Sequence, residues 1–267
     1  MTQESTTCVI SSVFEYNLTN DINKKIYHEF ICDKLRLNII TTNLVLFLTH
    51  RRDKSYAYCS NFYFCDSYCV GMLDFLLKLD VDIEIATKIS NHVIVCSEQA
   101  IMIIKAIIMK DYTTVEDLLN INNPSSETND NDIKIFCKRI KEIGRRIKNF
   151  NQKIWNNYLP EIVIRILLEK FRSNNMKSLI MQDITDVQSV FAEAASYDNI
   201  WGIGVDDKEL EAHRIISWKG YNMLGYGITA ISRYYLQIDQ SIEAEERFIQ
   251  SFCNIFIEFV NRYNKYK

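Results

Sequence analysis

The sequence predicts an α+β protein that is mainly helical: a single domain with few short strands and a helical extension at each end. Prolines occur only at Pro124 and Pro160, so little interrupts long helices. Apolar residues recur every three or four positions in several segments, whereas stretches with the length and composition of strands are fewer. Apolar residues make up 48% of the 267 residues and charged residues 24%, a composition that suits a globular protein with a sizeable core.

The clearest helix is expected at 241–263. Apolar residues form a stripe along it, Ser241 suits the N-cap, and glutamates occupy its first turns, where they favour the helix dipole. We interpret the stripe as core packing rather than a cofactor site. The other segments with a helical period are 97–109, 132–148 and 161–172.

Strand candidates are short and bounded by turn residues. We expect strands at 43–49, 190–195 and 200–205, and a polar loop at 121–132. The predicted organisation has three parts: an N-terminal extension at 1–53, a central domain at 54–235, and a C-terminal amphipathic helix at 236–267 packed on that domain.

Charge and hydropathy limit the classes of partner that the sequence predicts. The formal net charge is -3, which gives no global reason to expect a nucleic acid or a membrane. The first residues lack the cationic start and apolar run of a secretory signal, and no apolar run is long enough to span a bilayer. We therefore expect a cytoplasmic, intracellular protein with no membrane partner; nothing in the sequence predicts an oligomeric state.

Three of the eight cysteines lie close together, at Cys59, Cys65 and Cys69, downstream of His50. Four such ligands would suit zinc, but the spacings are irregular and no CxxC pair occurs. We favour reduced, largely buried thiols, and we expect no metal and no cofactor.

One lysine is embedded in apolar sequence. In a helix over 97–109, Glu98, Met102 and Lys105 share one face, with the first and last about 10 Å apart along the axis. Desolvation would lower the pKa of Lys105 and make it a nucleophilic amine, with Glu98 as a base or a cation stabiliser. The alternative is a helix-edge lysine whose ammonium group extends to water.

A basic stretch follows at 134–153, with eight Lys and Arg residues against the single acid Glu142. Arg145 and Arg146, beside Gly144, are the best candidates to hold a phosphate, because arginine offers a planar set of donors. A solvated helix face is the alternative.

Five of the seven glycines and two of the three tryptophans lie between Trp201 and Gly227. Glycine permits close backbone approach and tryptophan offers a stacking face, as a loop-built ligand site requires. Tight turns with two core tryptophans explain the same composition equally well.

Several motifs occur in a fixed order along the chain. They are Ser60-Asn61-Phe62-Tyr63, Ser97-Glu98-Gln99 with Lys105-Ala106, Gly144-Arg145, Lys170-Phe171, Glu193-Ala194, Asp198-x-x-Trp201-Gly202-x-Gly204, and Trp218-x-Gly220-x-Asn222-x-Leu224-Gly225 with Arg233. This ordered set resembles the NADAR (YbiA-like) domain family over roughly 60–233. The gap between Tyr63 and Ser97 is longer than usual in that family, and the 121–132 loop looks inserted.

The resemblance implies an N-glycosidase that acts on ribosylated substrates. It implies a catalytic group of Glu98, Lys105, Asp198 and Trp201. Lys105 would be the Schiff-base nucleophile, the two acids would transfer protons or stabilise a cation, and Trp201 would stack on the substrate. The substrate-binding residues that it implies are Asn61, Phe62, Tyr63, Arg145, Arg146, Glu193, Gly202, Gly204, Trp218 and Asn222.

Three functions follow as hypotheses. The first is hydrolysis of a phosphorylated ribosyl small molecule, such as the ribosylamino-pyrimidine phosphates of riboflavin synthesis. The second is reversal of ADP-ribosylation on guanine in nucleic acid. The third is binding of NAD or ADP-ribose without turnover, which Glu98 and Lys105 speak against. The acidic overall balance favours a small molecule, while the basic stretch keeps nucleic acid open.

Overall fold

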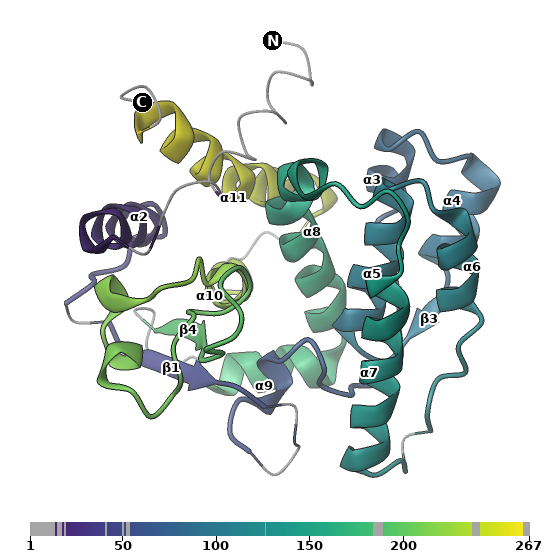
Figure 1. Ribbon diagram of the computed structural model, residues 1–267, viewed down its shortest axis with the longest axis horizontal. Helices are drawn as coiled ribbons and strands as arrows, with labels where there is room; N and C mark the ends of the chain where they lie inside the picture. The colour runs from purple at the N-terminus through teal and green to yellow at the C-terminus, as the bar shows by residue number, and fades with distance from the viewer. Residues whose placement is uncertain are drawn as a thin grey trace. The chain divides into compact units, whose positions relative to one another are not determined.

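The computed structural model describes residues 14, 18, 20–40, 42–49, 51, 54–125, 127–183, 189–236 and 241–263. Helices dominate this part of the chain and its strands are short, which confirms the predicted fold class (Figure 1). None of the helices described there is long and apolar enough to cross a bilayer.

The chain forms two compact units. The first unit consists of Met1–Leu48, Asn156–Ile164 and Ile180–Lys267, and the second of Thr49–Trp155 and Arg165–Leu179. Helices α8 (Gln152–Phe171) and α9 (Asn174–Asp183) contribute residues to both units. The predicted boundaries at 53 and 235 stay predictions.

The second unit is built around helix α5 (Ser97–Ile108), most of whose side chains are buried. Helix α7 (Asp130–Arg145) runs alongside it (Figure 1). Asn129 caps α7 with its side chain, which accepts the backbone N–H groups of Asn131 and Asp132. The remaining elements are α3 (Leu73–Lys78), α4 (Ile83–Ser90), α6 (Tyr112–Leu119), the 3-10 helix η2 (Ala57–Cys59), and the antiparallel strands β2 (Tyr68–Cys69) and β3 (Val93–Ile94).

The first unit contains a parallel strand pair. Strand β1 (Leu44–Phe47) pairs with β4 (Val190–Glu193), and Phe47 lies opposite Glu193. Helix α10 (Met223–Tyr234) packs against β4. The other elements are α2 (Asp21–Lys34), α11 (Ile242–Tyr263), and the 3-10 helices η3 (Leu210–His213) and η4 (Ile215–Ser217).

The predicted helices all exist, with shifted ends. Helix α11 begins one residue after Ser241, whose hydroxyl accepts the backbone N–H of Ala244 at 3.3 Å, as expected of an N-cap. The helix expected from 161 begins at Gln152 and includes Pro160. Its first nine residues, 152–160, were not predicted, because their polar side chains break the apolar stripe and Pro160 indicates a helix boundary.

The third predicted strand is wrong. Residues 200–205 form bends. The N–H of Ile203 bonds to the Glu193 carbonyl at the end of β4, but the other backbone bonds of these residues go to the Asp198 side chain and to the segment that leads into α10, so no strand ladder forms. The two other predicted strands exist in shorter form, as β1 and β4.

Candidate active site

Helix α5 presents an acid and an amine on one face. Glu98, in its first turn, keeps only 6% of its side chain exposed, and Lys105, near its end, is half-buried. Their separation of seven residues places both on the side that α7 covers. The predicted pairing of these two residues on one face is therefore present in the second unit.

Helix α7 packs against that face at Gly144, which has no side chain. A Cβ at position 144 would collide with the thioether of Met102, meeting its Cγ at 2.7 Å. Glycine thus permits this approach, as it does wherever two backbones must come close. The approach brings the cations on α7 towards Glu98 and Lys105.

Two of these cations act on the α5 face. The ammonium group of Lys141 lies 4.0 Å from Oε1 of Glu98 and 5.1 Å from the centre of the Phe62 ring. Arg145, one helical turn further on, is exposed, and its charge reaches Lys105. The site thus holds one buried carboxylate among several cations.

The Lys105 amine sits in an environment that disfavours its charge. Its Nζ lies 4.2 Å from the centre of the Phe150 ring, a contact that by itself favours the ammonium form. Burial lowers the pKa of Lys105 below its ordinary value, Lys141 and Arg145 lower it further, and Glu98 opposes them. The prediction of a depressed lysine pKa is supported, and the neutral amine becomes more accessible near neutral pH.

The turn at 60–63 supports the start of α5. The carbonyl of Asn61 accepts the backbone N–H of Glu98 at 3.0 Å. Lys170, only 1% exposed, donates from Nζ to the carbonyl of Ser60 at 2.7 Å. A buried lysine that binds a carbonyl holds this turn, and with it Phe62, in place.

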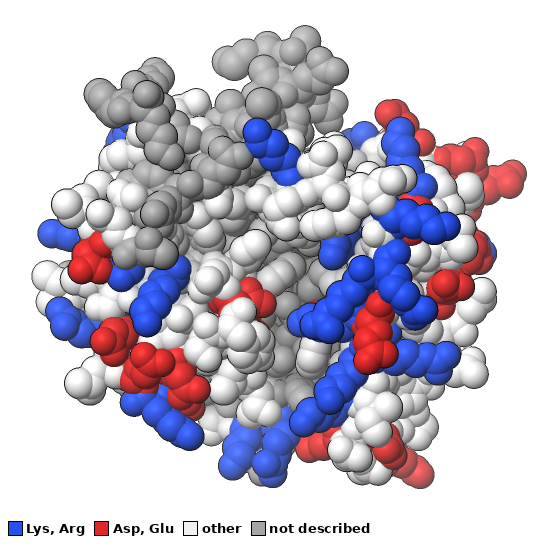
Figure 2. Space-filling view, in the orientation of Figure 1, with Lys and Arg blue, Asp and Glu red and all other residues white. Residues whose placement is uncertain are grey.

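Basic side chains gather over the region of α7 (Figure 2). Lys134, Lys138, Lys141 and Arg145 follow one another at intervals of three or four residues. They therefore form one stripe about 16 Å long on the helix surface. Arg146 lies outside the stripe, as the residue that follows the last helical position.

In the first unit, Asp198 organises the turn that follows β4. Its Oδ1 accepts the backbone N–H groups of Ile200 at 3.0 Å and Trp201 at 2.8 Å. Side-chain capping of this kind fixes a local turn. Asp198 therefore has a structural role in this turn, and the catalytic role that the resemblance implies stays a prediction.

The two glycine-rich motifs bond to one another along their backbones. The N–H groups of Lys219 and Gly220 donate to the carbonyl of Ile203, and that of Asn222 donates to Gly202. The next two N–H groups, of Met223 and Leu224, donate to the carbonyls of Ile200 and Trp201. These are the first N–H groups of α10, which a helix leaves unpaired.

Glycine is needed at two points of this contact. Gly204 has a φ of 66°, and a Cβ there would meet the Gly220 nitrogen at 3.0 Å. A Cβ on Gly220 would collide with the Gly202 carbonyl. The glycines therefore serve close backbone packing, which is one of the two interpretations left open by the sequence.

Asn222 and Trp218 are both fully buried. Asn222 has a left-handed backbone with φ 52°; its Nδ2 donates to the Phe191 carbonyl, and its Oδ1 accepts the Glu193 N–H. The Trp218 indole N–H donates to the Ala212 carbonyl at 2.9 Å. Both side chains are committed to the protein itself, so their predicted contact with substrate has no support in the structure.

A sequence profile of the NADAR domain matches residues 46–234. The chain belongs to the NADAR domain family. The match contains both glycine-rich motifs and the α5–α7 face, and it excludes α2 and α11.

Two other proteins are similar in sequence to this chain over shorter stretches. Protein irg-1 of Caenorhabditis elegans is 30% identical over 132 residues, which is 49% of this chain and 55% of that protein. N-glycosidase R617 of Acanthamoeba polyphaga mimivirus is 35% identical over 89 residues, which is 33% of this chain and 51% of that protein. The matched region spans about half the length of each relative.

Within this NADAR domain the predicted site residues other than Arg146 and Trp218 fall into two sets. In the second unit the structure brings together the turn at 60–63 and the α5 and α7 residues; these are Asn61, Phe62, Tyr63, Glu98, Lys105 and Arg145. In the first unit it brings together Glu193, Asp198, Trp201, Gly202, Gly204 and Asn222. Their roles in binding and catalysis stay predictions.

Three residues that the structure adds were not singled out from the sequence. Lys141 was one member of the basic stretch, and its spacing of four from Arg145 marks the same helix face. Phe150 follows the end of α7 in a polar segment, which hid its contact with Lys105. Tyr197, 81% exposed, lies near Glu193 and Asp198.

The cysteine cluster has an ordinary explanation. Cys59 and Cys65 are buried and Cys69 is exposed, all as free thiols. His50 lies outside the described residues. Where the structure describes the chain, no group of three or more His, Cys, Asp or Glu residues is placed to hold a metal.

Proposed function

We propose that this chain is an N-glycosidase that hydrolyses the bond between a phosphorylated ribose and an exocyclic nitrogen. Membership of the NADAR family and the likeness to a protein named N-glycosidase R617 support the reaction class. The single observation that carries the proposal is the α5 face: a half-buried lysine with a lowered pKa near a buried carboxylate, beside exposed cations.

A ribose on an exocyclic nitrogen can open at its C1′–O4′ bond: O4′ takes up a proton to become a hydroxyl group, and C1′ is left as an iminium ion. The neutral Nζ of Lys105 adds to C1′, and the C1′–N bond to the leaving base then breaks as that nitrogen takes a proton. The product is a Schiff base between C1′ and Lys105. Water adds to C1′, the lysine leaves, and the freed aldehyde closes to ribose.

Glu98 suits two steps of this sequence. Its carboxylate can stabilise the positive charge at C1′, and it can take the proton from the attacking water. Without the covalent step, the same charge would stabilise an oxocarbenium ion formed directly by the closed sugar. The burial of Lys105 favours the covalent route, because it lowers the pKa of the amine and makes the neutral nucleophile more accessible.

The phosphate is assigned to the cations of α7. Lys141 and Arg145 flank the acid–lysine face and offer charge and hydrogen-bond donors. Asp198 and Trp201 keep their predicted roles in proton transfer and stacking, each to be tested by itself.

A second candidate rests on the basic stripe of α7. Four cations at regular spacing over about 16 Å suit a chain of phosphates, as in a nucleic-acid strand that carries ADP-ribose on guanine. A binding module without turnover is the third candidate. Binding alone requires neither an amine with a lowered pKa nor a buried acid on the same helix face.

The deciding experiment supplies two substrates in parallel. The full chain is incubated with a ribosylamino-pyrimidine phosphate and, separately, with DNA that carries ADP-ribosylated guanine; mass spectrometry follows release of the base. We expect release from the small molecule, with Glu98→Gln as the inactive control. Release only from DNA favours the second candidate, and binding without release from either favours the third.

A further inference from the structure

Helix α2 lies outside the matched domain, yet its buried side chains reach one of the family's motifs. We infer that α2 positions the 218–222 segment, which carries the predicted site residues Trp218 and Asn222. Tyr27 does so through a buried hydrogen bond to the backbone of the segment, and His28 through a ring contact with Trp218 and a buried hydrogen bond to Tyr226 of α10. The functional part of this inference rests on the proposed N-glycosidase activity. The structural part does not.

Tyr27 fixes the backbone just before Asn222. Its side chain is fully buried, and its hydroxyl donates to the carbonyl of Tyr221 at 3.1 Å. The two tyrosine rings also meet edge to face, with centres 5.3 Å apart. One side chain of α2 thus holds both the main chain and the side chain of residue 221.

His28 fixes the start of the same segment. Its Nδ1 lies 2.8 Å from the hydroxyl of Tyr226, and its ring meets Trp218 edge to face at 5.4 Å. Burial lowers the pKa of His28 to about 3, and the Trp218 backbone opposes this only in part. The imidazole is therefore neutral near pH 7 and forms a neutral hydrogen bond with the tyrosine.

The segment held by α2 leads directly to predicted site residues. Asn222 follows Tyr221 and bridges strand β4 through the Phe191 carbonyl and the Glu193 N–H. Its own N–H donates to the carbonyl of Gly202. A displacement of the Tyr221 carbonyl would therefore reach both Glu193 and the turn that carries Trp201.

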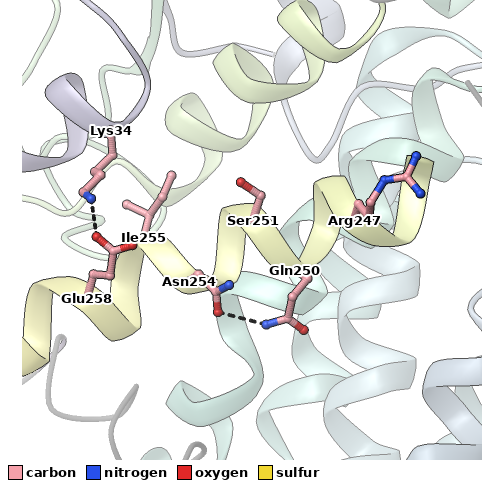
Figure 3. Close-up of a pocket in the computed structure, with 7 residues that line it drawn as sticks. All are labelled: Lys34, Arg247, Gln250, Ser251, Asn254, Ile255 and Glu258. Atoms are coloured by element: carbon pink, nitrogen blue, oxygen red, sulfur yellow. Dashed lines mark hydrogen bonds and ion pairs between the residues drawn. The ribbon is translucent and has the colours of Figure 1, made fainter. Parts of the chain in front are cut away.

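Helix α11 in turn supports α2. The Phe259 ring meets Tyr27 at 5.3 Å and Phe30 at 5.4 Å between ring centres. Lys34, at the end of α2, forms an ion pair with Glu258 of α11 (Figure 3). The same two helices line a polar groove formed by Lys34, Arg247, Gln250, Ser251, Asn254, Ile255 and Glu258. Helix α11 thus supports the 218–222 segment indirectly, through its contacts with α2.

The chemistry of these positions distinguishes positioning from simple packing. A buried hydroxyl or imidazole costs free energy unless it is hydrogen-bonded, so phenylalanine and leucine would fill the same space more cheaply. Polar atoms at these places specify one arrangement of the loop, which apolar contacts alone do not. Phe30, on the same helix, contacts α11 and makes no such bond to the motif.

Tyr27→Phe in the full chain tests the inference, with Phe30→Leu as the matched control. Hydrogen exchange of the 218–224 amides is measured without substrate and compared with exchange in α5. We expect Tyr27→Phe to speed exchange at 218–224 about fivefold, the effect of one net hydrogen bond, and to leave α5 unchanged. Phe30→Leu should lower Tm without this selective change.

A second pair covers His28. His28→Leu should also loosen 218–224, and His28→Asn, which keeps a polar atom near the Nδ1 position, should restore much of the protection. With a substrate that the parent protein turns over, Tyr27→Phe should lower kcat more than it raises KM.

Unchanged exchange at 218–224 in both Tyr27→Phe and His28→Leu would overturn the inference. So would faster exchange with unaltered kcat, which would leave α2 as packing while the proposed reaction stands. If the parent protein turns over neither substrate, the proposed function fails, and the exchange result alone decides whether α2 holds the segment.

Discussion

Gly144 of α7 packs directly against the thioether of Met102 on α5, with no room for a Cβ between them. Met102 lies on the face of α5 that also carries Glu98 and Lys105. The absence of a side chain at 144 is therefore what lets Lys141 and Arg145 act on that face.

Gly144→Ala should push α7 away from α5. Overpacking of this kind costs about 1–3 kcal/mol of unfolding free energy, and the displaced cations should lower kcat/KM as well. Urea unfolding and steady-state kinetics measure both effects. In Met102→Ala/Gly144→Ala the new methyl group gains space, so the double variant should be more stable than the sum of the single changes implies. Strict additivity would contradict the close contact.

The pKa of Lys105 should respond to its neighbours in opposite directions. Lys141 lowers this pKa and Glu98 raises it. Lys141→Gln should therefore move the pH dependence of Lys105 labelling by an amine reagent to higher pH, and Glu98→Gln should move it to lower pH. Lys134→Gln is the control. It lies on the same stripe about two turns from Lys141, and it should leave the pH dependence of Lys105 labelling unchanged. Shifts in the same direction for both variants would contradict the geometry.

Arg145 and Arg146 should differ although they are neighbours in sequence. Arg145 continues the stripe that includes Lys141, whereas Arg146 follows the end of the helix. Arg145→Gln should raise KM for a phosphorylated substrate about tenfold and make the remaining activity less sensitive to salt, with little change in kcat. Arg146→Gln should have a much smaller effect. Equal effects would assign the phosphate to the general charge of α7 instead.

Asp198 stabilises a turn through its side chain, and it also has a predicted role in catalysis. Asp198→Asn keeps an acceptor for the Ile200 and Trp201 N–H groups, so Tm should stay within a few degrees while turnover falls about 100-fold or more. Asp198→Ala loses the acceptor and should cost about 1 kcal/mol in addition. Normal turnover in Asp198→Asn would leave Asp198 with the structural role alone.

The sequence predicts the fold class and the elements with a single apolar stripe. Helices α5, α7 and α11 follow from their apolar periodicity, and β1 and β4 from short apolar stretches. The first turns of α8 have no such stripe, because their polar residues and Pro160 interrupt the apolar pattern. The strand expected at 200–205 failed because alternating glycines and a capping aspartate override a short apolar pattern.

The site divides in the same way. The shared face of Glu98 and Lys105 follows from a spacing of seven on one helix. The contributions of Lys141 and Phe150 depend on how α7 packs, which no local pattern specifies. Trp218 and Asn222 were expected to face a ligand, yet the side chain of each forms hydrogen bonds with the backbone of the first unit. A motif can therefore stand out in a sequence for either of two reasons: its residues contact the substrate, or they hold the backbone of the site in place.

Replacement of Lys105 separates charge from covalent chemistry. Lys105→Arg keeps a cation but cannot form an imine, so turnover should fall severely. Lys105→Met should fold at least as well as the parent near pH 7, because it removes a partly desolvated charge. This advantage should shrink as pH rises towards the ordinary lysine pKa: the unfolded state binds more protons than the folded state in that range, so the parent gains stability with pH.

The most direct test of the covalent mechanism is borohydride reduction during turnover, with the mass of each tryptic peptide as the readout. The lowered pKa of Lys105 and its place on the α5 face predict a stable ribosyl adduct on the peptide that contains Lys105. The adduct should be absent from Lys105→Arg and from the parent protein without substrate. No adduct on Lys105 in a protein that is turning over, together with normal turnover in Lys105→Arg, would contradict the mechanism and leave direct attack by water.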